Sequence, residues 1–491
     1  MTADVLVVGA GPAGLAAAWR AAARGHRVVV LERADHVGGM AASFEVAGIR
    51  VDLGSHRLHP SIDPVILGQL RSLLGDHLQL RPRHGRIRLA GRWLRFPLAP
   101  GDIVRNAPRR FAAGVVVDTM RSPWRRPKAD TFDEVVRAGL GPTVADEFYG
   151  PYIRKLWGVD PSELSGELAR RRVSARSPGD LLTRLARSAR PSAAPTPGQS
   201  FLYPARGFGE ISERLADAAV AAGAEIRLGT EVVGLDLSRD DHVVVDARPR
   251  ASGSGSTGGV APGGPASDRG GAGGDEGLDA GQVWSTGPLA ALAASARPAP
   301  PTDALAAARR LVHRALVLVY LVLDRPRYTE FDAHYFPGTD VLPSRLSEPK
   351  NYRDGDDPVG VTVLCAEVAC TVGDAIWSMA NADLGAAVAD SLERQGLPLV
   401  DHVAVEVRRL PHVYPLYRPG FEADVAALTA WVDAHPRLVT FGRQGLFVPD
   451  NTHHALAMGW AAADALGADG SFDRAAWSRA RDRFATHVVE D

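Results

Sequence analysis

A glycine-rich turn between two short apolar runs is the feature that most constrains the fold of this chain. Residues 5–8 form the first run, Gly9-Ala10-Gly11-Pro12-Ala13-Gly14 follows directly, and an alanine-rich segment leads to a second run at residues 26–31 that ends at Glu32. Buried parallel strands are continuously apolar because helices cover both faces of their sheet. This N-terminal segment therefore predicts a strand, a helix and a second, parallel strand.

The spacing Gly9-x-Gly11-x-x-Gly14 is typical of a dinucleotide-binding turn when it follows a strand and opens a helix. Its glycines permit a tight turn, a close approach of a pyrophosphate and close helix packing, and the helix N-terminus attracts the anion. Glu32 is placed to accept hydrogen bonds from ribose hydroxyls. An acidic residue there favours a ribose without a 2′-phosphate, as in FAD or NAD.

The residues after Glu32 favour FAD over NAD. Gly38-Gly39-Met40-Ala41 is similar to the second glycine pair of the glutathione-reductase-like flavoproteins, and no second GxGxxG follows a strand. A single bound FAD is the simplest interpretation.

Composition excludes several classes of protein. Length alone predicts two or three domains, because 491 residues exceed what one core usually supports. A formal charge of −1 without a long basic run argues against nucleic acid as a partner. Cys365 and Cys370 cannot form a disulfide framework and are expected to be small buried side chains. With neither a signal-peptide pattern nor a transmembrane-length apolar run, we expect a soluble, cytoplasmic protein.

The pattern along the chain changes several times. Residues 60–190 carry helical segments, residues 190–200 form a proline-rich link, and strand and helix patterns return at Phe201. Residues 251–280 contain eleven glycines and bury too little apolar surface to order, so we expect a disordered loop over 249–280. Residues 310–410 contain the runs expected of a mixed sheet.

Motifs along nearly the whole chain resemble the flavoprotein superfamily of the amine oxidases, protoporphyrinogen oxidases and UDP-galactopyranose mutases, and are most similar to its mutase-like branch. The matching stretches include VDLGSHRLHP at 51–60, GRWLRFPL at 91–98, FYGPYIRKLWGVDPSELSGELARRRV at 148–173, FLYPARGFGEI at 201–211 and GRQGLFVPDNTHHAL at 442–456.

The resemblance implies a mixed α/β fold with three parts. A discontinuous, Rossmann-like FAD domain of the glutathione-reductase type would comprise 1–80, 201–300 and 419–491. A helical substrate or cap domain would comprise 81–200, and a mixed-sheet substrate domain 301–418.

The resemblance also implies a set of cofactor-binding residues. Those at the adenosine and diphosphate end are Gly9, Gly11, Pro12, Ala13, Gly14, Glu32, Arg33, Gly38, Gly39, Met40, Ala41, Val232, Val233, Gly442 and Arg443. Those beside the flavin ring are Gly54, Ser55, His56, Asn451, Thr452, His453 and Ala455. His59 is the candidate catalytic residue, since polar groups near flavin tune its electronics; a structural hydrogen bond is the alternative for each histidine.

For the substrate, the resemblance implies contacts from Tyr152, Trp157, Arg171 and Arg345, whereas Arg170 and Arg172 are assigned to a solvated helix surface. Arginine suits a pyrophosphate because its fork binds two oxygens. Pro343 and Pro449 stand where the mutases have two tyrosines that bind the diphosphate, and proline has neither a hydroxyl nor an N–H donor. No metal ligand set is predicted.

Two functions stay open. The first is an FAD-dependent oxidoreductase that transfers a hydride between flavin N5 and a small molecule, such as a nucleotide sugar, a glycoside or a secondary metabolite. The alternative is a redox-neutral isomerase of the mutase type, in which reduced flavin is the nucleophile. A flavin-binding protein without catalysis is a third, weaker interpretation.

Overall fold

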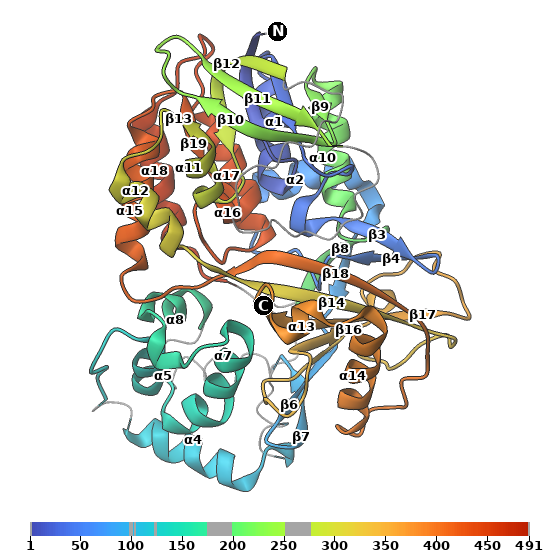
Figure 1. The fold of residues 1–491 in the computed structure, drawn as a ribbon. Coiled ribbons are helices and arrows are strands. Elements are labelled where there is room, and N and C mark those ends of the chain that lie inside the picture. Colours follow the sequence, from blue (N-terminus) through green and yellow to red (C-terminus); the bar gives the residue numbers. More distant parts are fainter. Residues whose placement is uncertain are drawn as a thin grey trace.

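The computed structural model describes residues 2–97, 102, 105–121, 125–173, 199–250 and 276–489. Two large sheets dominate it, one of eight strands and one of seven. In Figure 1 the seven-stranded sheet crosses the middle of the molecule, with the eight-stranded sheet above it and a group of helices below.

The eight-stranded sheet is built on the predicted strand–helix–strand unit. Its first strand pairs in parallel with the second and with a strand that is distant in the sequence. The order is β13-β10-β11-β12-β1-β2-β9, with β19 also paired to β12. The strands are β1 (Thr2–Val8), β2 (Val28–Leu31), β9 (Glu225–Arg227), β10 (Thr230–Asp236), β11 (Val243–Pro249), β12 (Glu276–Ser285), β13 (Ala296–Arg297) and β19 (Leu438–Thr440).

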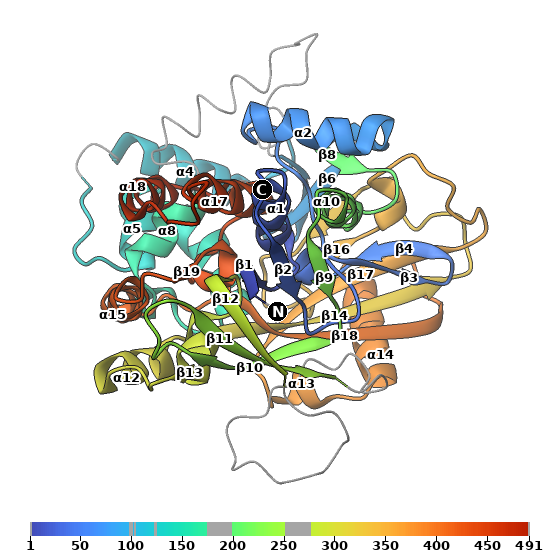
Figure 2. The ribbon, with the colours of Figure 1, turned by 90° about the horizontal axis from the view of Figure 1, so that it is seen from above.

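Helices cover this sheet, and residues 5–7 of β1 are completely buried, as their unbroken apolar run predicts. Helix α1 packs between α10 and α17, a row that is clear in Figure 2. The helices of this part are α1 (Pro12–Ala22), α2 (Pro64–Leu74), α10 (Glu210–Ala221), α11 (Leu289–Ser295), α12 (Thr302–Arg310), α15 (Phe421–Asp433), α16 (Gly442–Gly445), α17 (Thr452–Asp464) and α18 (Arg474–Phe484).

The seven-stranded sheet has the order β18-β14-β17-β16-β15-β6-β7. Strand β14, second from one edge, is antiparallel to both neighbours and almost entirely buried. The strands are β6 (Gly85–Leu89), β7 (Arg92–Phe96), β14 (His313–Leu323), β15 (Ala333–Tyr335), β16 (Arg345–Ser347), β17 (Thr362–Cys370) and β18 (His402–Pro415). Two helices accompany them, α13 (Ala375–Ser378) and α14 (Asn381–Glu393).

The helical group and the small elements complete the described fold. The helices are α4 (Arg109–Arg121), α5 (Phe132–Gly139), α6 (Pro142–Val144), α7 (Gly150–Trp157) and α8 (Gly166–Arg172), with a π-helical turn at Ala145–Tyr149. Two small antiparallel pairs are the hairpin β3 (Ser43–Val46) with β4 (Ile49–Asp52), and β5 (Leu78–Pro82) with β8 (Ser200–Pro204), which are distant in the sequence. Short 3-10 turns lie at Gly39–Ala41, Gly75–His77, Pro161–Glu163 and Pro349–Asn351.

Two boundaries differ from the expectation. The expected helical part, 81–200, begins with the hairpin β6–β7, which joins the seven-stranded sheet through β15. Alternate residues of β6 are buried, so this arginine-rich stretch has the period of a strand. Residues 276–280, expected in the glycine-rich loop, belong to β12 and pair with β1 and β11. The rest of that loop, 251–275, and most of the proline-rich link lie outside the described residues.

Both cysteines are buried, as expected, in β17. Burial raises the pKa of the Cys370 thiol to about 12, so this group stays protonated. Among the helices of the described residues, none combines the length and the apolar character that crossing a bilayer requires.

Candidate active site

In the glycine turn after β1, one glycine has free space beside it and another is packed against the backbone. A Cβ added to Gly11 would meet nothing within 4 Å, whereas one added to Gly14 would lie 2.0 Å from the carbonyl oxygen of Gly9. Gly9 itself has a φ of 103°, a backbone conformation that residues with a side chain rarely adopt. Gly14 therefore serves the packing of α1 on β1, while the open face at Gly11 admits a ligand close to the backbone.

Glycines from two other segments meet the same turn. A Cβ added to Gly39 would lie 3.4 Å from the Cα of Gly11, and one added to Gly442 would lie 3.1 Å from the Cβ of Ala13. The predicted glycines from residues 9–14, 38–39 and 442 thus converge at the N-terminus of α1. Close approach of three backbone segments around a helix N-terminus suits an anionic diphosphate.

Glu32 lies at the end of β2 and is 8% exposed. Its carboxylate accepts hydrogen bonds from the backbone N–H groups of Ala10, at 2.8 Å, and Ala34, at 2.9 Å. These bonds fix the carboxylate beside the glycine turn, where sequence reasoning expected it to meet a ribose.

The loop that follows β4 carries the predicted flavin-side residues Gly54, Ser55 and His56. The Ser55 N–H donates to Glu367 Oε1 at 2.8 Å, and its hydroxyl bonds the phenol of Tyr352. His56 stacks on Phe208 at 5.2 Å, and its Nε2 lies 3.0 Å from the Leu53 carbonyl oxygen. Burial lowers the pKa of His56, so its imidazole is neutral at neutral pH.

Arg443 is a buried cation on α16. Its Nη2 donates to the Val413 carbonyl at 2.7 Å and its Nη1 to the Asp450 carbonyl at 3.3 Å. Among the described residues, its buried Nε has no hydrogen-bond partner. Burial lowers the pKa of Arg443, which indicates a cation whose environment is incomplete.

The start of α17 lies beside the flavin-side loop. Asn451 caps the helix in a capping box with His454, and the His453 ring lies 5.9 Å from the ring of His59. His59 is 6% exposed, and its Nδ1 lies 2.7 Å from Ser61 Oγ. The fold thus brings two of the predicted flavin-side segments together, although they lie near opposite ends of the sequence.

The remaining predicted cofactor residues lie on α1, α17, β10 and the segments near them. Pro12 and Ala13 form the first turn of α1, Thr452 and Ala455 the first turn of α17, and the amide of Gln444 approaches the Met40 sulfur at 3.6 Å. Arg33 is exposed and Ala41 buried. Val232 and Val233 are partly exposed on β10, where the register with β11 shifts.

Arg345 forms an ion pair with Glu367 near the flavin-side loop. Its Nε and Nη2 donate to the Glu367 carboxylate at 2.8–3.0 Å. The Glu367 side chain is 2% exposed and that of Arg345 21%. No described residue accepts from Arg345 Nη1, which leaves the two N–H groups of that nitrogen for a ligand.

Arg171 and Arg172 of α8 are both partly buried and contact different groups. Arg171 faces Glu167, at 2.8 Å, and the Ala485 carbonyl, at 3.1 Å. The guanidinium of Arg172 lies 5.1 Å from the ring centroid of Trp157. Arg172, expected on a solvated surface, is therefore the arginine of α8 that meets the predicted substrate aromatic. Arg170 pairs with Asp130 and Glu167 on the surface, as expected.

The predicted aromatic contacts are partly enclosed. Trp157 is 1% exposed, and its indole N–H donates to the Pro415 carbonyl at 3.2 Å, so its ring serves packing. Tyr152 is half-buried and stacks on Phe148 at 5.9 Å. The carbonyl oxygen of Pro343 accepts a hydrogen bond from Lys155 Nζ at 2.9 Å. Pro449 is buried.

Tyr414 of β18 is a central residue that sequence reasoning missed. The guanidinium carbons of Arg172 and Arg443 lie 5.9 and 6.0 Å from its ring centroid. Burial raises the pKa of the Tyr414 phenol, as does Glu367, while Arg345 and the other two guanidinium groups oppose the shift. Three arginines and one carboxylate therefore surround this phenol. Glu367 was detectable in principle, since a carboxylate in the apolar run of β17 requires a partner.

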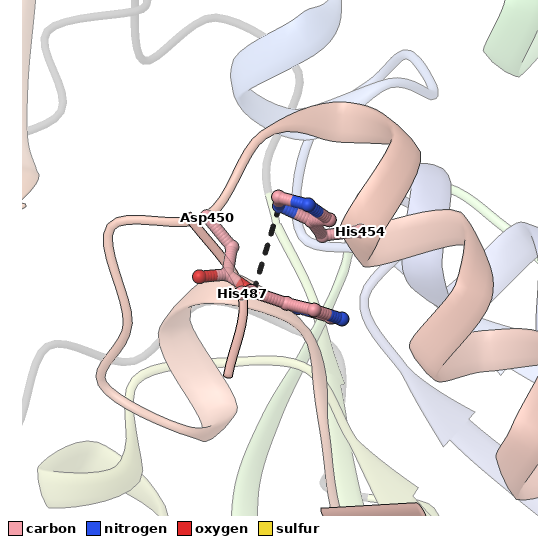
Figure 3. A group of neighbouring side chains, drawn as sticks. All are labelled: Asp450, His454 and His487. Atoms are coloured by element: carbon pink, nitrogen blue, oxygen red, sulfur yellow. Dashed lines mark hydrogen bonds and ion pairs between the residues drawn. The ribbon is translucent and has the colours of Figure 1, made fainter. Parts of the chain in front are cut away.

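Asp450, His454 and His487 form a separate cluster whose ligand-type atoms all lie within 4.8 Å (Figure 3). His487 Nδ1 is 2.6 Å from Asp450 Oδ2, and the two imidazoles stack at 4.0 Å with their planes 13° apart. Stacked rings cannot both direct an in-plane nitrogen at one ion, and Arg171 Nη1 lies 3.7 Å from Asp450 Oδ1. The cluster attaches the C-terminal segment to the loop before α17.

Comparisons with known proteins agree with this geometry. Residues 7–73 match the NAD(P)-binding Rossmann-like domain family. A putative flavin-containing monoamine oxidase of Mycobacterium tuberculosis is 32% identical over 191 residues, which cover 35% of this chain and 41% of that protein. The match thus spans less than half of that relative's length.

Solved structures cover the whole chain. A reduced UDP-galactopyranose mutase superposes with a TM-score of 0.77 at 19% identity, over 99% of both chains. This chain has the fold of the UDP-galactopyranose mutases. A protoporphyrinogen oxidase-like protein from Exiguobacterium sp. 255-15, itself named as putative, superposes with a TM-score of 0.68 at 18% identity, over 94% of this chain and 97% of that one. The mixed α/β fold and the superfamily resemblance inferred from the sequence are confirmed.

Proposed function

We propose that this chain is an FAD-dependent oxidoreductase acting on a small molecule. The observation that carries the proposal is the open backbone at Gly11, approached by Gly39 and Gly442 and flanked by the fixed carboxylate of Glu32. An ADP moiety fits this arrangement, because its diphosphate needs backbone approach and its ribose needs an acceptor. The names of the relatives support FAD as the cofactor.

The flavin end of the cofactor fits a second set of residues. The loop at Gly54–His56 and the start of α17 would border the ring, and Arg443, with its unpartnered buried Nε, would face the diphosphate side. FAD supplies an N5 atom that accepts or gives a hydride. Among the described residues, neutral His56 and buried His59 are two groups on the predicted flavin side that can hold or move a proton, and we propose His59 for that role.

The charge near Tyr414 favours an anionic substrate. Arg172, Arg345 and Arg443 surround the phenol, and Glu367 is the carboxylate that acts on it directly. A protonated amine would be repelled by this excess of positive charge, whereas a phosphate or carboxylate would be attracted. We therefore propose a substrate with such an anionic group, rather than the simple amine that the name of the monoamine oxidase relative implies.

We also propose the division of the chain into an FAD domain, a helical domain and a mixed-sheet domain, with the hairpin β6–β7 belonging to the sheet domain. A water-excluding site would form where the three parts meet, because the loop after β4, α8, β16 and β18 all contribute to it.

A redox-neutral isomerase is the second candidate, favoured by the full-length superposition on a UDP-galactopyranose mutase. Pro343 and Pro449 count against it, because neither side chain can donate a hydrogen bond to a diphosphate.

Flavin spectroscopy of the purified protein tests both candidates. We expect a yellow protein whose flavin is bleached by substrate and recolours in air. Activity that appears only after reduction with dithionite, with no net consumption of electrons, would replace the oxidoreductase by the isomerase. A protein that stays colourless in excess FAD would overturn both.

A further inference from the structure

Lys155 of α7 is a buried cation held by backbone carbonyls. Its Nζ donates to the carbonyl oxygens of Phe336 at 2.8 Å, Gly338 at 2.7 Å and Pro343 at 2.9 Å. An ammonium has three N–H donors, so the three carbonyls satisfy it completely. The contact joins the helical part of the chain to the loop 336–343, which follows much later in the sequence.

The loop held by Lys155 leads directly to Arg345. Pro343 is followed by Ser344, whose N–H and hydroxyl both donate to the Glu367 carbonyl, at 2.8 and 3.1 Å. The next residue, Arg345, donates to the Glu367 carboxylate. Because the last carbonyl of the cage lies just before Ser344 and Arg345, the ammonium limits where that guanidinium can lie.

The same chain of contacts reaches the predicted flavin side. Glu367 Oε1 also accepts the Ser55 N–H at 2.8 Å, and a Cβ added to Gly54 would lie 3.5 Å from that oxygen. The path from Lys155 to the loop after β4 therefore consists of hydrogen bonds, the backbone from Pro343 to Arg345 and one ion pair, with Glu367 as the shared acceptor.

Helix α7 is attached to the seven-stranded sheet at a second point. Trp157, at the end of the same helix, donates its indole N–H to the Pro415 carbonyl at 3.2 Å. Pro415 follows Tyr414, the phenol surrounded by arginines. Helix α7 is therefore attached to the sheet at two points. Lys155 holds the loop before Arg345 of β16, and Trp157 holds β18 next to Tyr414.

We propose that Lys155 is a positioning residue, whose ammonium holds the 336–343 loop so that Arg345 presents its free Nη1 to the anionic group of the substrate. This inference rests on the proposed function, since it assumes an anion bound beside the cofactor. Lys155 itself is enclosed by carbonyls and touches neither substrate nor cofactor.

The charge state of Lys155 provides a specific readout. Burial lowers the pKa of Lys155 to about 7, and Asp340, the charged group that acts on it, opposes the shift. A neutral amine has only two N–H donors, so one of the three carbonyls loses its donor above that pH. A side chain that does not act through its charge would not make the affinity for an anion change near pH 7.

The test measures anion binding to the FAD-loaded protein with inorganic sulfate, which keeps a constant charge across neutral pH, as the probe. Flavin difference spectra give its Kd for the wild type, Lys155→Met and the matched control Lys350→Met. Lys350 Nζ also donates to three carbonyls, those of Pro326, Pro358 and Val361, at a partly exposed site away from the arginines near Tyr414.

We expect Lys155→Met to raise the Kd for sulfate about tenfold at about pH 6, and Lys350→Met to leave it within about twofold of the wild type. At about pH 8.5 the difference in Kd between the wild type and Lys155→Met should be smaller than at about pH 6, because Lys155 is then neutral and holds only two of the three carbonyls.

Unchanged sulfate affinity in Lys155→Met at about pH 6, with FAD bound, would overturn the proposal, as would a wild type that binds FAD but not sulfate. Failure of the wild type to bind FAD would instead overturn the proposed function. If Lys155→Met does not fold, Lys155→Gln keeps two donors and should show a smaller loss. If neither variant folds, the wild type decides: an affinity for sulfate that does not fall between about pH 6 and about pH 8.5 would overturn the proposal.

Discussion

Glu367 accepts two donors of Arg345 and, with the same Oε1, the backbone N–H of Ser55. One carboxylate on β17 thus links the candidate anion-binding arginine to the candidate flavin-side loop. A displacement of either partner is therefore transmitted to the other through a buried group.

Glu367→Gln should destabilise the protein strongly. It removes the negative charge that balances Arg345, and breaking a buried ion pair costs about 3–5 kcal/mol; we expect about 3 kcal/mol, since the Arg345 side chain is 21% exposed. Urea unfolding of the variant measures this loss. The control is Glu406→Gln, which breaks the more exposed pair with Arg408 and should cost less than about 1 kcal/mol. Equal losses of unfolding free energy in the two variants would contradict the conclusion that the Glu367–Arg345 pair is the more strongly stabilising one.

Gly11→Ala and Gly14→Ala should separate cofactor binding from folding. Gly11 has open space and an extended backbone, so the alanine variant should unfold at the wild-type temperature yet bind FAD at least about tenfold more weakly. Gly14→Ala places a methyl group against the Gly9 carbonyl and should lower the melting temperature of the apoprotein. Thermal unfolding and FAD titration of both variants check this, and normal FAD affinity in Gly11→Ala would refute the proposed site.

Lys155 should titrate near neutral pH. The chain has three lysines, so selective ¹³Cε labelling gives three signals, and burial lowers the pKa of Lys155 from 10.5 to about 7. A lysine pKa that is lower in the folded state makes stability rise with pH from about 7 to about 10.5, because the unfolded chain binds more protons there. The melting temperature of the wild type should rise relative to Lys155→Met over this interval. Three signals that all titrate near 10.5 would exclude the shift.

Arg172→Ala should weaken binding of an anion more than Arg171→Ala does. Arg172 stacks against Trp157 and lies near Tyr414, so its loss removes positive charge from the site, and we expect about a tenfold rise in the Kd for sulfate. Arg171 contacts Glu167 and the Ala485 carbonyl, so Arg171→Ala should mainly lower stability. The opposite ranking in titrations of the FAD-loaded variants would restore Arg171 as the anion contact.

Local features of the cofactor site were predictable because they depend on neighbouring residues. The turn at Gly9–Gly14 and the carboxylate of Glu32 lie where the sequence pattern predicts them. The hairpin β6–β7 was not recognised, because residues 60–190 were expected to be helical, although Ile87 and Leu89 alternate with arginines on the buried face of β6. A period of two over so short a strand is a weak signal without the partner strand.

Local sequence patterns were enough to predict the strand–turn–helix unit, its dinucleotide signature and the superfamily resemblance. Three contacts became visible only in the folded chain: Glu367 with both Arg345 and Ser55, Arg172 rather than Arg171 with Trp157, and Lys155 with the 336–343 loop. The physical reason is that side-chain direction on a helix and the pairing of strands distant in sequence are set by packing between elements, which no local pattern encodes.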